Sequence, residues 1–512
     1  MKRSRETGQH RSPHHQTIWA KAINRYLAQY AEAICQQMPL LGPQGVTEST
    51  MCMSYEHVLV IPAFDEPVGC LDHVLPPTLA RTLVIVVVNA AEDSDRAAID
   101  RTQQLWQSFQ REDSDTPLSG SSTPQPKRYH LIAHSENTTV LVIDCCTEGN
   151  QLPPNQGVGL ARKVGGDIAL TYMAQGVVTS DWIHYTDADV KLPDDFFQME
   201  LSSVLQGASS AQPKTQQDDI AVVLYPFRHQ PPNRHILLYE LSLRYYVTEL
   251  AKARSPYAFH TIGSLMCVNG LHYAKVRGFP KRKAAEDFYM LNKLAKTGTI
   301  VQLQAPIVQL DSRLSHRVPF GTGAMMTKLT QLDEFVFYHP AVFQHLREWM
   351  DCIDALWPPI YETNRPSQSL DASNDYLLSA WLSESPWQGA CWINCLVDMG
   401  LEKTLKQAYR QSRDRHHFYI YMHTWFDAFR TLKFVHYLRD HHYPSLVVEE
   451  WASLINRKRT LGGDAHPMTT KIDVQSTKIE IHHLEDINQY FCDLEIKLGA
   501  IVGPTIASHE KF

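Results

Sequence analysis

The 512-residue chain is long enough for two or more domains with packed interiors. Its 48 basic and 55 acidic residues give a net charge of -7, which argues against a general electrostatic attraction to nucleic acid or to an anionic membrane. The polar first sixteen residues predict no secretory signal, no run approaches the ~20 apolar residues of a membrane span, and the ten cysteines include no C-x-x-C pair. We therefore expect a cytoplasmic protein with reduced thiols, in which any phosphate-binding site is a local feature.

The first predicted element is an amphipathic helix at roughly residues 17–38, which we expect to pack on the domain that follows. From His57 onward, apolar strands alternate with helices. Near-continuous runs of Val, Ile and Leu are typical of parallel strands that are covered on both faces, so the pattern predicts a doubly wound α/β domain. The expected strands are 57–64, 82–89, 139–144 and 182–186, and the expected helices are 95–110, 157–175 and 194–205.

The pattern changes to helical periodicity after about Leu332, which predicts an all-α C-terminal domain. Three histidine doublets in this region lack accompanying carboxylates or cysteines, so we expect exposed histidines near helix ends and no metal site there. Two polar stretches, 111–128 and 207–219, predict surface insertions without fixed structure. The expected helices of the C-terminal domain include 375–382, 392–409 and 417–439. The predicted division is an N-terminal tail and helix (1–50), an α/β domain (51–330) and a helical domain (331–512).

Two carboxylates, Asp187 and Asp189, directly follow the strand expected at 182–186. Side chains two apart on an extended segment point the same way, so both would bind one divalent cation, Mn or Mg, whose other positions take phosphate oxygens and water. The same spacing occurs at 93–95 and 113–115. Only Asp187 and Asp189, however, lie at the exit of a buried-type strand, where ligands of open α/β sheets bind. The sequence therefore predicts a metal that holds a diphosphate.

Residues at two neighbouring strand ends are placed to flank a nucleotide base. Pro62, Phe64 and Glu66 lie at the end of the first strand, and Asn89 ends the second, with an amide that donates as well as accepts. Arg162, near the start of the helix expected at 157–175, would reach the base or a phosphate, helped by the positive end of the helix. A surface arginine without such a role is the alternative.

The segments that carry these residues follow one another in a fixed order. They are I-P-A-F-D-E at 61–66, the strand end at Asn89, G-V-G-L-A-R-K-V-G at 157–165, D-A-D at 187–189, and G-S-L-M-C-V-N-G at 263–270 leading to Glu286 and Asp287. Together they resemble glycosyltransferase family 2 over residues 57–323, while the helical remainder is not covered. Asn89 departs from the family pattern, which usually has an aspartate there that reads the base. The resemblance implies a Rossmann-like A-type glycosyltransferase domain with a mostly parallel sheet.

The resemblance also implies a reaction, the transfer of a sugar from a nucleotide-diphospho-sugar to a hydroxyl acceptor with inversion. Asp287 would be the catalytic base and Glu286 would orient the acceptor. An ionised carboxylate takes the proton as the C–O bond forms, when the hydroxyl has become acidic. Because acidic residues in a first helical turn are common for local reasons, helix capping is the alternative.

A further segment, 311–323, lies where A-type transferases often carry a loop that closes over the donor. Arg313 and Arg317 are spaced to bind phosphate oxygens, and a neutral His316 would complete the metal shell. Gly321 and Gly323 would give the loop its hinge. An ordinary basic loop between domains is the alternative.

Three functions stay open at this point. The first is an inverting, metal-dependent glycosyltransferase, a hexosyltransferase by expectation. The second is a retaining A-type enzyme acting on glycerate or phosphoglycerate, and the third is a non-catalytic protein that binds nucleotide sugars. The sequence does not identify the base or the sugar of the donor, and it does not identify the acceptor. The oligomeric state is also open, and a homo-oligomer is one of the alternatives.

Overall fold

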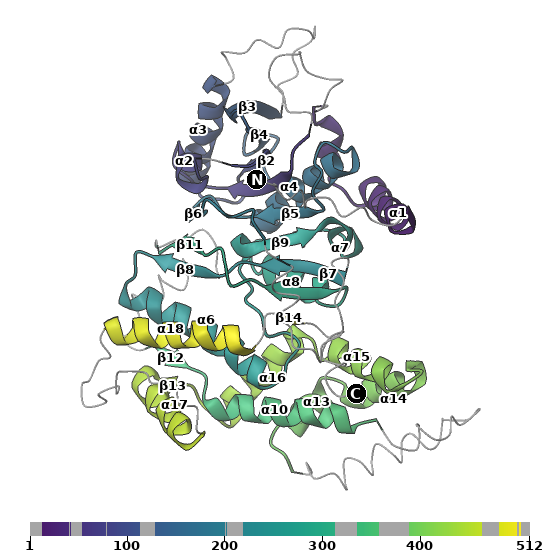
Figure 1. The fold of residues 1–512 in the computed structure, drawn as a ribbon, viewed down its shortest axis with the longest axis vertical. Helices are drawn as coiled ribbons and strands as arrows, with labels where there is room; N and C mark the ends of the chain where they lie inside the picture. The colour runs from purple at the N-terminus through teal and green to yellow at the C-terminus, as the bar shows by residue number, and fades with distance from the viewer. Residues whose placement is uncertain are drawn as a thin grey trace, which may run out of the picture.

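The computed structural model describes residues 13–39, 41, 54–77, 79–112, 128–199, 201, 219–312, 335–357, 389–462, 481–498 and 501–502. An α/β part and a helical part follow one another along the long axis of the molecule (Figure 1). Within the described residues no helix is both long enough and apolar enough to cross a membrane.

A mixed sheet forms the centre of the α/β part. Of the nine strands described in it, six run in one direction (β10, β7, β5, β1, β2 and β4) and three run in the other (β14, β9 and β3). The predicted class, a mostly parallel α/β sheet followed by a helical region, is confirmed. In sheet order the strands are β14 (Ile501–Val502), β10 (Thr299–Gln302), β7 (Ile220–Leu224), β9 (Met266–Asn269), β5 (Trp182–Tyr185), β1 (His57–Ala63), β2 (Thr82–Asn89), β4 (Thr138–Cys145) and β3 (Tyr129–Ser135).

Alternate residues of the central strands face two different apolar layers, as the side-chain period of a strand requires. Val58 and Val60 of β1 belong to one layer, whereas Leu59 and Ile61 belong to the other. The first layer contains residues of α1 (Pro13–Gln29), α4 (Gly157–Ala174), α7 (Gly270–Lys275) and α8 (Glu286–Leu294), and the second contains residues of α2 (Cys70–Val74) and α3 (Arg96–Glu112). A small sheet of β6 (Val190–Lys191), β11 (Val308–Asp311) and β8 (Phe227–Gln230) also borders the second layer.

The N-terminal helix is attached to this part through a buried carboxylate, Asp167 of α4. Tyr26 of α1 donates to Asp167 Oδ1 at 2.5 Å, and Lys163 Nζ donates to Oδ2 at 2.7 Å. Since Asp167 is fully buried, these bonds supply the compensation that its charge needs. The expected helix at 17–38 therefore does pack on the following part, as α1 and a short 3-10 turn, η1 (Ala33–Gln37).

A second apolar core lies in the helical part, and it includes a helix from the middle of the chain, α6 (Arg234–Lys252). Helix α18 (Ile481–Leu498) lies along α6 (Figure 1). Trp349, Trp392 and Trp451 are fully buried in this core, so these aromatics serve helix packing. The other elements are α10 (Pro340–Ala355), α13 (Ile393–Asp398), α14 (Leu401–Gln411), α15 (Arg415–Trp425), α16 (Ala428–His441), α17 (Val448–Gly462), β12 (Val336–Phe337) and β13 (Leu446–Val447).

Some expected elements differ from the structure. The helices expected at 392–409 and 417–439 are each two helices, and residues 194–197 form a turn where a helix was expected to begin. The stretch 375–382 and most of both polar stretches lie outside the described residues. The histidine doublets lie near helix ends with exposed or half-buried side chains, as expected, and the described cysteines are all free thiols.

Candidate active site

The predicted site residues come from strands that end at one edge of the sheet. Strand β1 lies between β5 and β2, so the chain order reverses at β1, and crevices at such positions are where open α/β sheets bind ligands. Pro62 lies in β1, Asn89 ends β2, and Asp187 follows β5 by two residues. The register places the three strand ends at a similar level, because Ala63 of β1 pairs with Val88 of β2 and Val60 of β1 pairs with Tyr185 of β5.

Asn89 has an amide oxygen that nothing in the described chain satisfies. The residue is 4 % exposed, and its Oδ1 has no hydrogen-bond partner among the described residues. A buried polar atom without a partner is costly, so one at a ligand-binding edge indicates a group that a ligand would satisfy. Phe64 on the neighbouring strand end is half-buried and packs against the apolar layer of α2 and α3.

Arg162 joins two of the predicted site carboxylates. Its guanidinium is buried, its Nη2 donates to Asp187 Oδ1 at 2.5 Å, and its Nε lies 3.3 Å from Glu286 Oε1. The Asp187 side chain stays 35 % exposed, so one side of this ion pair faces solvent. Arg162 is therefore not a surface arginine, because its side chain is only 4 % exposed.

Two glycines allow this arrangement. A Cβ on Gly159, in the first turn of α4, would lie 2.3 Å from the carbonyl oxygen of Pro280, which precedes α8. A Cβ on Gly263 would lie 2.5 Å from Arg162 Nη1. Gly159 thus lets α4 contact the segment leading to α8, and Gly263 leaves room for the guanidinium. Both glycines lie in the sequence motifs at 157–165 and 263–270, and the residue type itself is the signal for these close approaches.

Asp187 lies close to several other carboxylates. Burial raises its pKa, Arg162 opposes that rise, and the negative charges of Asp189, Glu286 and Glu66 add to it. Glu66 is itself buried, at 6 % exposure. The structure therefore brings together the strand-end residue Glu66 and the Asp187–Asp189 pair.

Glu286 and Asp287 occupy the first turn of α8, behind Ala285, which takes a left-handed conformation with φ of 58°. Burial raises the pKa of Glu286, and the neighbouring Asp287 raises it further while Arg162 lowers it. The pKa of Asp287 is also raised, first by burial, with Arg162 acting against it. Asp287 Oδ1 accepts from the Phe288 N–H at 2.7 Å. A carboxyl group with a raised pKa is a stronger base when ionised, which suits proton transfer.

The third group of predicted residues, Arg313, His316 and Arg317, lies outside the described residues. Among the described residues no cluster of three or more His, Cys, Asp or Glu side chains is arranged to hold a metal. The Asp187–Asp189 pair nevertheless offers carboxylate oxygens, the ligand type that Mn and Mg prefer.

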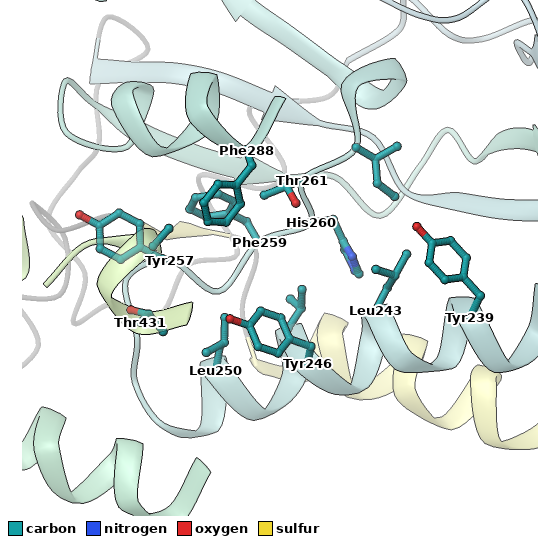
Figure 2. Close-up of a pocket in the computed structure, with 13 residues that line it drawn as sticks. Tyr239, Leu243, Tyr246, Leu250, Tyr257, Phe259, His260, Thr261, Phe288 and Thr431 are labelled. Atoms are coloured by element: carbon teal, nitrogen blue, oxygen red, sulfur yellow. The ribbon is translucent and has the colours of Figure 1, made fainter. Parts of the chain in front are cut away.

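An aromatic pocket lies between α6 and the segment that leads to Gly263. Figure 2 shows Leu243, Tyr246 and Leu250 of α6 on one wall, facing Phe259 and His260. Phe288, next to Asp287, and Ile262, next to Gly263, also line it. This pocket was not predicted from the sequence, because the residues of α6 have an ordinary helical pattern and nothing local indicates which segment the helix faces.

No protein-family model and no curated protein matches the chain. Among solved structures, it is similar to S. aureus TarS 1-349 in complex with UDP-GlcNAc, at 11 % identity over 70 % of this chain and 92 % of that chain, with a TM-score of 0.29. It is also similar to the mannosyltransferase PcManGT from Pyrobaculum calidifontis in complex with GDP-Man and Mn2+, at 13 % identity over 81 % and 94 % of the two chains, with a TM-score of 0.30. Both of these solved structures are A-type glycosyltransferases.

Proposed function

We propose that the protein is a metal-dependent glycosyltransferase that moves a sugar from a nucleotide-diphospho-sugar to a hydroxyl acceptor with inversion. The observation that carries the proposal is the buried Arg162, which bridges Asp187 and Glu286 at the carboxyl edge of the sheet. One guanidinium does not balance the surrounding carboxylates, since the negative charges of Asp189 and Asp287 also act on this group of residues. Such an excess of negative charge favours binding of a divalent cation.

Asp187 and Asp189 would hold the cation, with His316 as a further ligand. The two carboxylates fit Mn or Mg, and an imidazole is also a ligand that Mn accepts, with the remaining positions left for phosphate oxygens and water. When bound, the cation would offset the charge of the leaving diphosphate.

The nucleotide would lie across the ends of β1 and β2. Pro62, Phe64 and Glu66 would flank the base, and the unsatisfied Oδ1 of Asn89 would accept a hydrogen bond from it. Arg162, Arg313 and Arg317 would bind the phosphates, as guanidinium groups commonly do.

Asp287 would act as the base of a single in-line displacement. The acceptor oxygen bonds to the anomeric carbon, the bond from that carbon to the diphosphate oxygen breaks, and the acceptor proton passes to the Asp287 carboxylate. Glu286, which Arg162 holds in place, would orient the acceptor. The raised pKa of Asp287 supports this role, because burial makes its carboxylate a stronger base.

Donor and metal binding test the proposal directly. In a thermal-shift screen of nucleotide sugars, with and without Mn, we expect one donor to raise the melting temperature only when Mn is present, since a ligand bound by the native state stabilises it. The Asp189→Ala variant should lose this shift. The Asp100→Ala variant, which changes an exposed carboxylate paired with Arg96, should keep it. A shift that is equal with and without Mn would contradict the metal requirement.

Product analysis tests the reaction itself. NMR of the product should show inverted configuration at the anomeric carbon. Retained configuration would contradict the role of Asp287 as the base of a single displacement. Binding of donor with neither hydrolysis nor transfer would leave a nucleotide-sugar-binding protein in place of an enzyme.

A further inference from the structure

Two residues that line the aromatic pocket beside α8 are chain neighbours of residues in the carboxylate cluster. Phe288 follows Asp287 directly, and Ile262 precedes Gly263, which contacts Arg162. Because the Gly263 backbone also hydrogen-bonds Asp287, an acceptor bound in this pocket would have a chain neighbour of the proposed base, Phe288, in its wall. This step rests on the proposed function.

The side chains that line the pocket carry no net charge that would attract a charged ligand. None of its thirteen lining residues is Asp, Glu, Lys or Arg. Its one titratable imidazole, His260, bonds through Nε2 to Glu495 Oε1 of α18 at 2.8 Å, so any charge on that ring is already matched. A phosphate or carboxylate placed here would lose its hydration without gaining a counter-charge, which is costly.

The size and the polarity of the pocket further restrict the class of ligand that fits it. The cavity volume is about 170 Å³, close to the ~150 Å³ of an engineered cavity that holds benzene. Aromatic and aliphatic side chains form most of the walls, and the Tyr257 hydroxyl already donates a hydrogen bond to the His423 carbonyl at 2.9 Å. Thr431 is buried, and its hydroxyl has no hydrogen-bond partner among the described residues. The space thus suits one ring with few polar groups, and Thr431 offers that ring one hydrogen bond.

We propose that this pocket binds the acceptor and that the acceptor is an uncharged hydroxyl compound carrying an aryl ring. The ring inserts between α6 and the 257–262 segment, and the hydroxyl group is presented to Asp287. Glycerate and phosphoglycerate, the acceptors of the retaining alternative, do not fit this chemistry.

Two glucosides that differ only in the ring provide the test. By isothermal titration calorimetry, the full chain should bind phenyl β-D-glucoside and should bind methyl β-D-glucoside at least about tenfold more weakly, a discrimination that a shaped apolar pocket achieves. No binding of 3-phosphoglycerate at this site is expected. Equal binding of the two glucosides, binding of neither, or tighter binding of 3-phosphoglycerate would overturn the inference.

Variants at Leu243, a half-buried residue that lines the pocket, locate the binding. Leu243→Trp fills the space and should abolish phenyl glucoside binding, whereas Leu243→Met keeps the volume and should retain it. Both variants should keep the donor shift with Mn, which also shows that they are folded. Unchanged phenyl glucoside binding in Leu243→Trp would place the ring elsewhere and overturn the inference. If the native protein binds phenyl glucoside but no nucleotide sugar raises its melting temperature with Mn, the proposed function would be overturned instead.

Discussion

At the scale of single residues, Arg162 organises the site. Its 4 % exposed guanidinium contacts Asp187 from the strand edge and Glu286 from α8, so one side chain connects the proposed metal ligands with the proposed acceptor side. Removal of this group would leave buried carboxylates without compensation, which is costly in a protein interior. We therefore propose that Arg162 positions Asp187 and Glu286 in addition to binding phosphate.

Replacement of the proposed base tests the chemistry most directly. The Asp287→Asn variant keeps the shape of the side chain but cannot take a proton, so turnover should fall by about 10²- to 10⁴-fold, the usual contribution of a general base. The donor shift with Mn should remain, measured beside initial rates of sugar transfer.

Asp398→Asn, an exposed position in α13, is the matched control and should leave the rate unchanged. Full turnover in Asp287→Asn would contradict the role of Asp287 as the base and would favour the alternative, helix capping.

The sequence located the strand-end residues because the apolar runs of β1, β2 and β5 are unambiguous and polar side chains follow them directly. It did not show that Arg162 is buried, because the partners that bury it, Glu286 and Gly263, are distant in the chain. Contacts between distant segments depend on packing, which local patterns do not encode.

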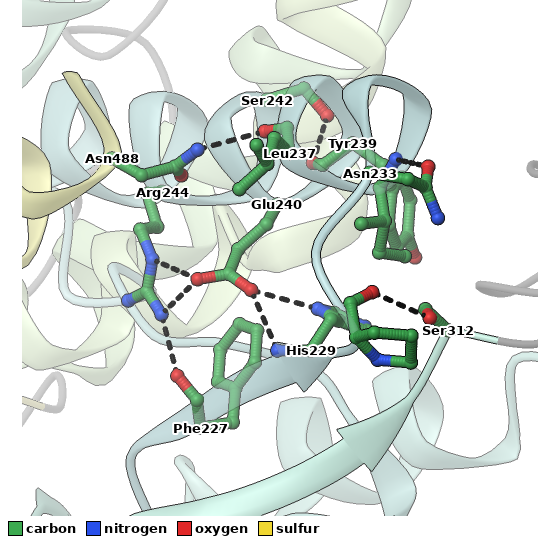
Figure 3. A network of polar contacts seen from close by, with 12 residues as sticks. Phe227, His229, Asn233, Leu237, Tyr239, Glu240, Ser242, Arg244, Ser312 and Asn488 are labelled. Carbon is green, nitrogen blue, oxygen red and sulfur yellow. Dashed lines mark hydrogen bonds and ion pairs between the residues drawn. The ribbon is translucent and has the colours of Figure 1, made fainter. Parts of the chain in front are cut away.

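At the scale of elements, a buried polar network joins α6 to β8 and α18. Figure 3 shows Glu240 of α6 between His229 and Arg244. Glu240 Oε2 accepts from His229 N at 3.0 Å, and Oε1 accepts from Arg244 Nη2 at 2.8 Å. Arg244 also donates to Glu495 of α18 at 2.8 Å. The network therefore connects the second core with the wall of the aromatic pocket, where Glu495 bonds His260.

This network makes folding stability depend on pH. Burial alone would raise the pKa of Glu240, but the hydrogen bond from His229 and the charge of Arg244 lower it from 4.5 to about 2. Because the folded-state pKa is depressed, the carboxylate contributes its full stability above about pH 4.5 and loses it as the pH falls toward 2.

The Glu240→Gln variant should thus be less stable than the native protein by about 3 kcal/mol at neutral pH, the usual cost of breaking a buried ion pair. The difference should shrink as the pH falls below 4.5, as measured by urea unfolding across the acid range. Glu485→Gln, at an exposed position of α18, should show no such trend. A difference that is constant with pH would rule out Glu240 ionisation as its source.

Helix ends were the weakest part of the sequence-based prediction. The break between α13 and α14 is at Gly400, which has a φ of 88°, and Asp414 and Asp427 cap the starts of α15 and α16. Periodicity averages over such single residues, so it merged neighbouring helices into long ones. The apolar character of those helices was nevertheless predicted, because it extends over several turns.

At the scale of the whole molecule, Asp427 links the two parts of the chain. It caps α16, and its Oδ2 accepts from Lys296 Nζ at 2.6 Å and from Asn292 Nδ2 at 3.1 Å. Asn292 lies on α8, the helix that carries Glu286 and Asp287. Through this contact the helical part supports the position of the proposed base.

The Asp427→Ala variant should therefore lose both stability and activity. We expect about 1–3 kcal/mol of destabilisation, from the lost cap and from the unpaired groups on the α8 side. Asp414→Ala removes the equivalent cap from α15, whose capping contact is within its own helix, and should cost about 1 kcal/mol with an unchanged transfer rate. Thermal unfolding measures the stability of the two variants, and initial rates measure their sugar transfer. Equal effects of the two substitutions on the transfer rate would exclude a positioning role for Asp427.

The placement of α6 also bears on how this gene tolerates recombination. Residues 234–252 are encoded within the α/β region, yet their apolar side chains fill the helical core, and β14 near the end of the chain returns to pair with β10. A crossover at the predicted boundary near residue 330 would thus separate a helix from the partners that bury it. Chimeras between relatives of this protein should fold only when α6 and the helical region are inherited from the same parent.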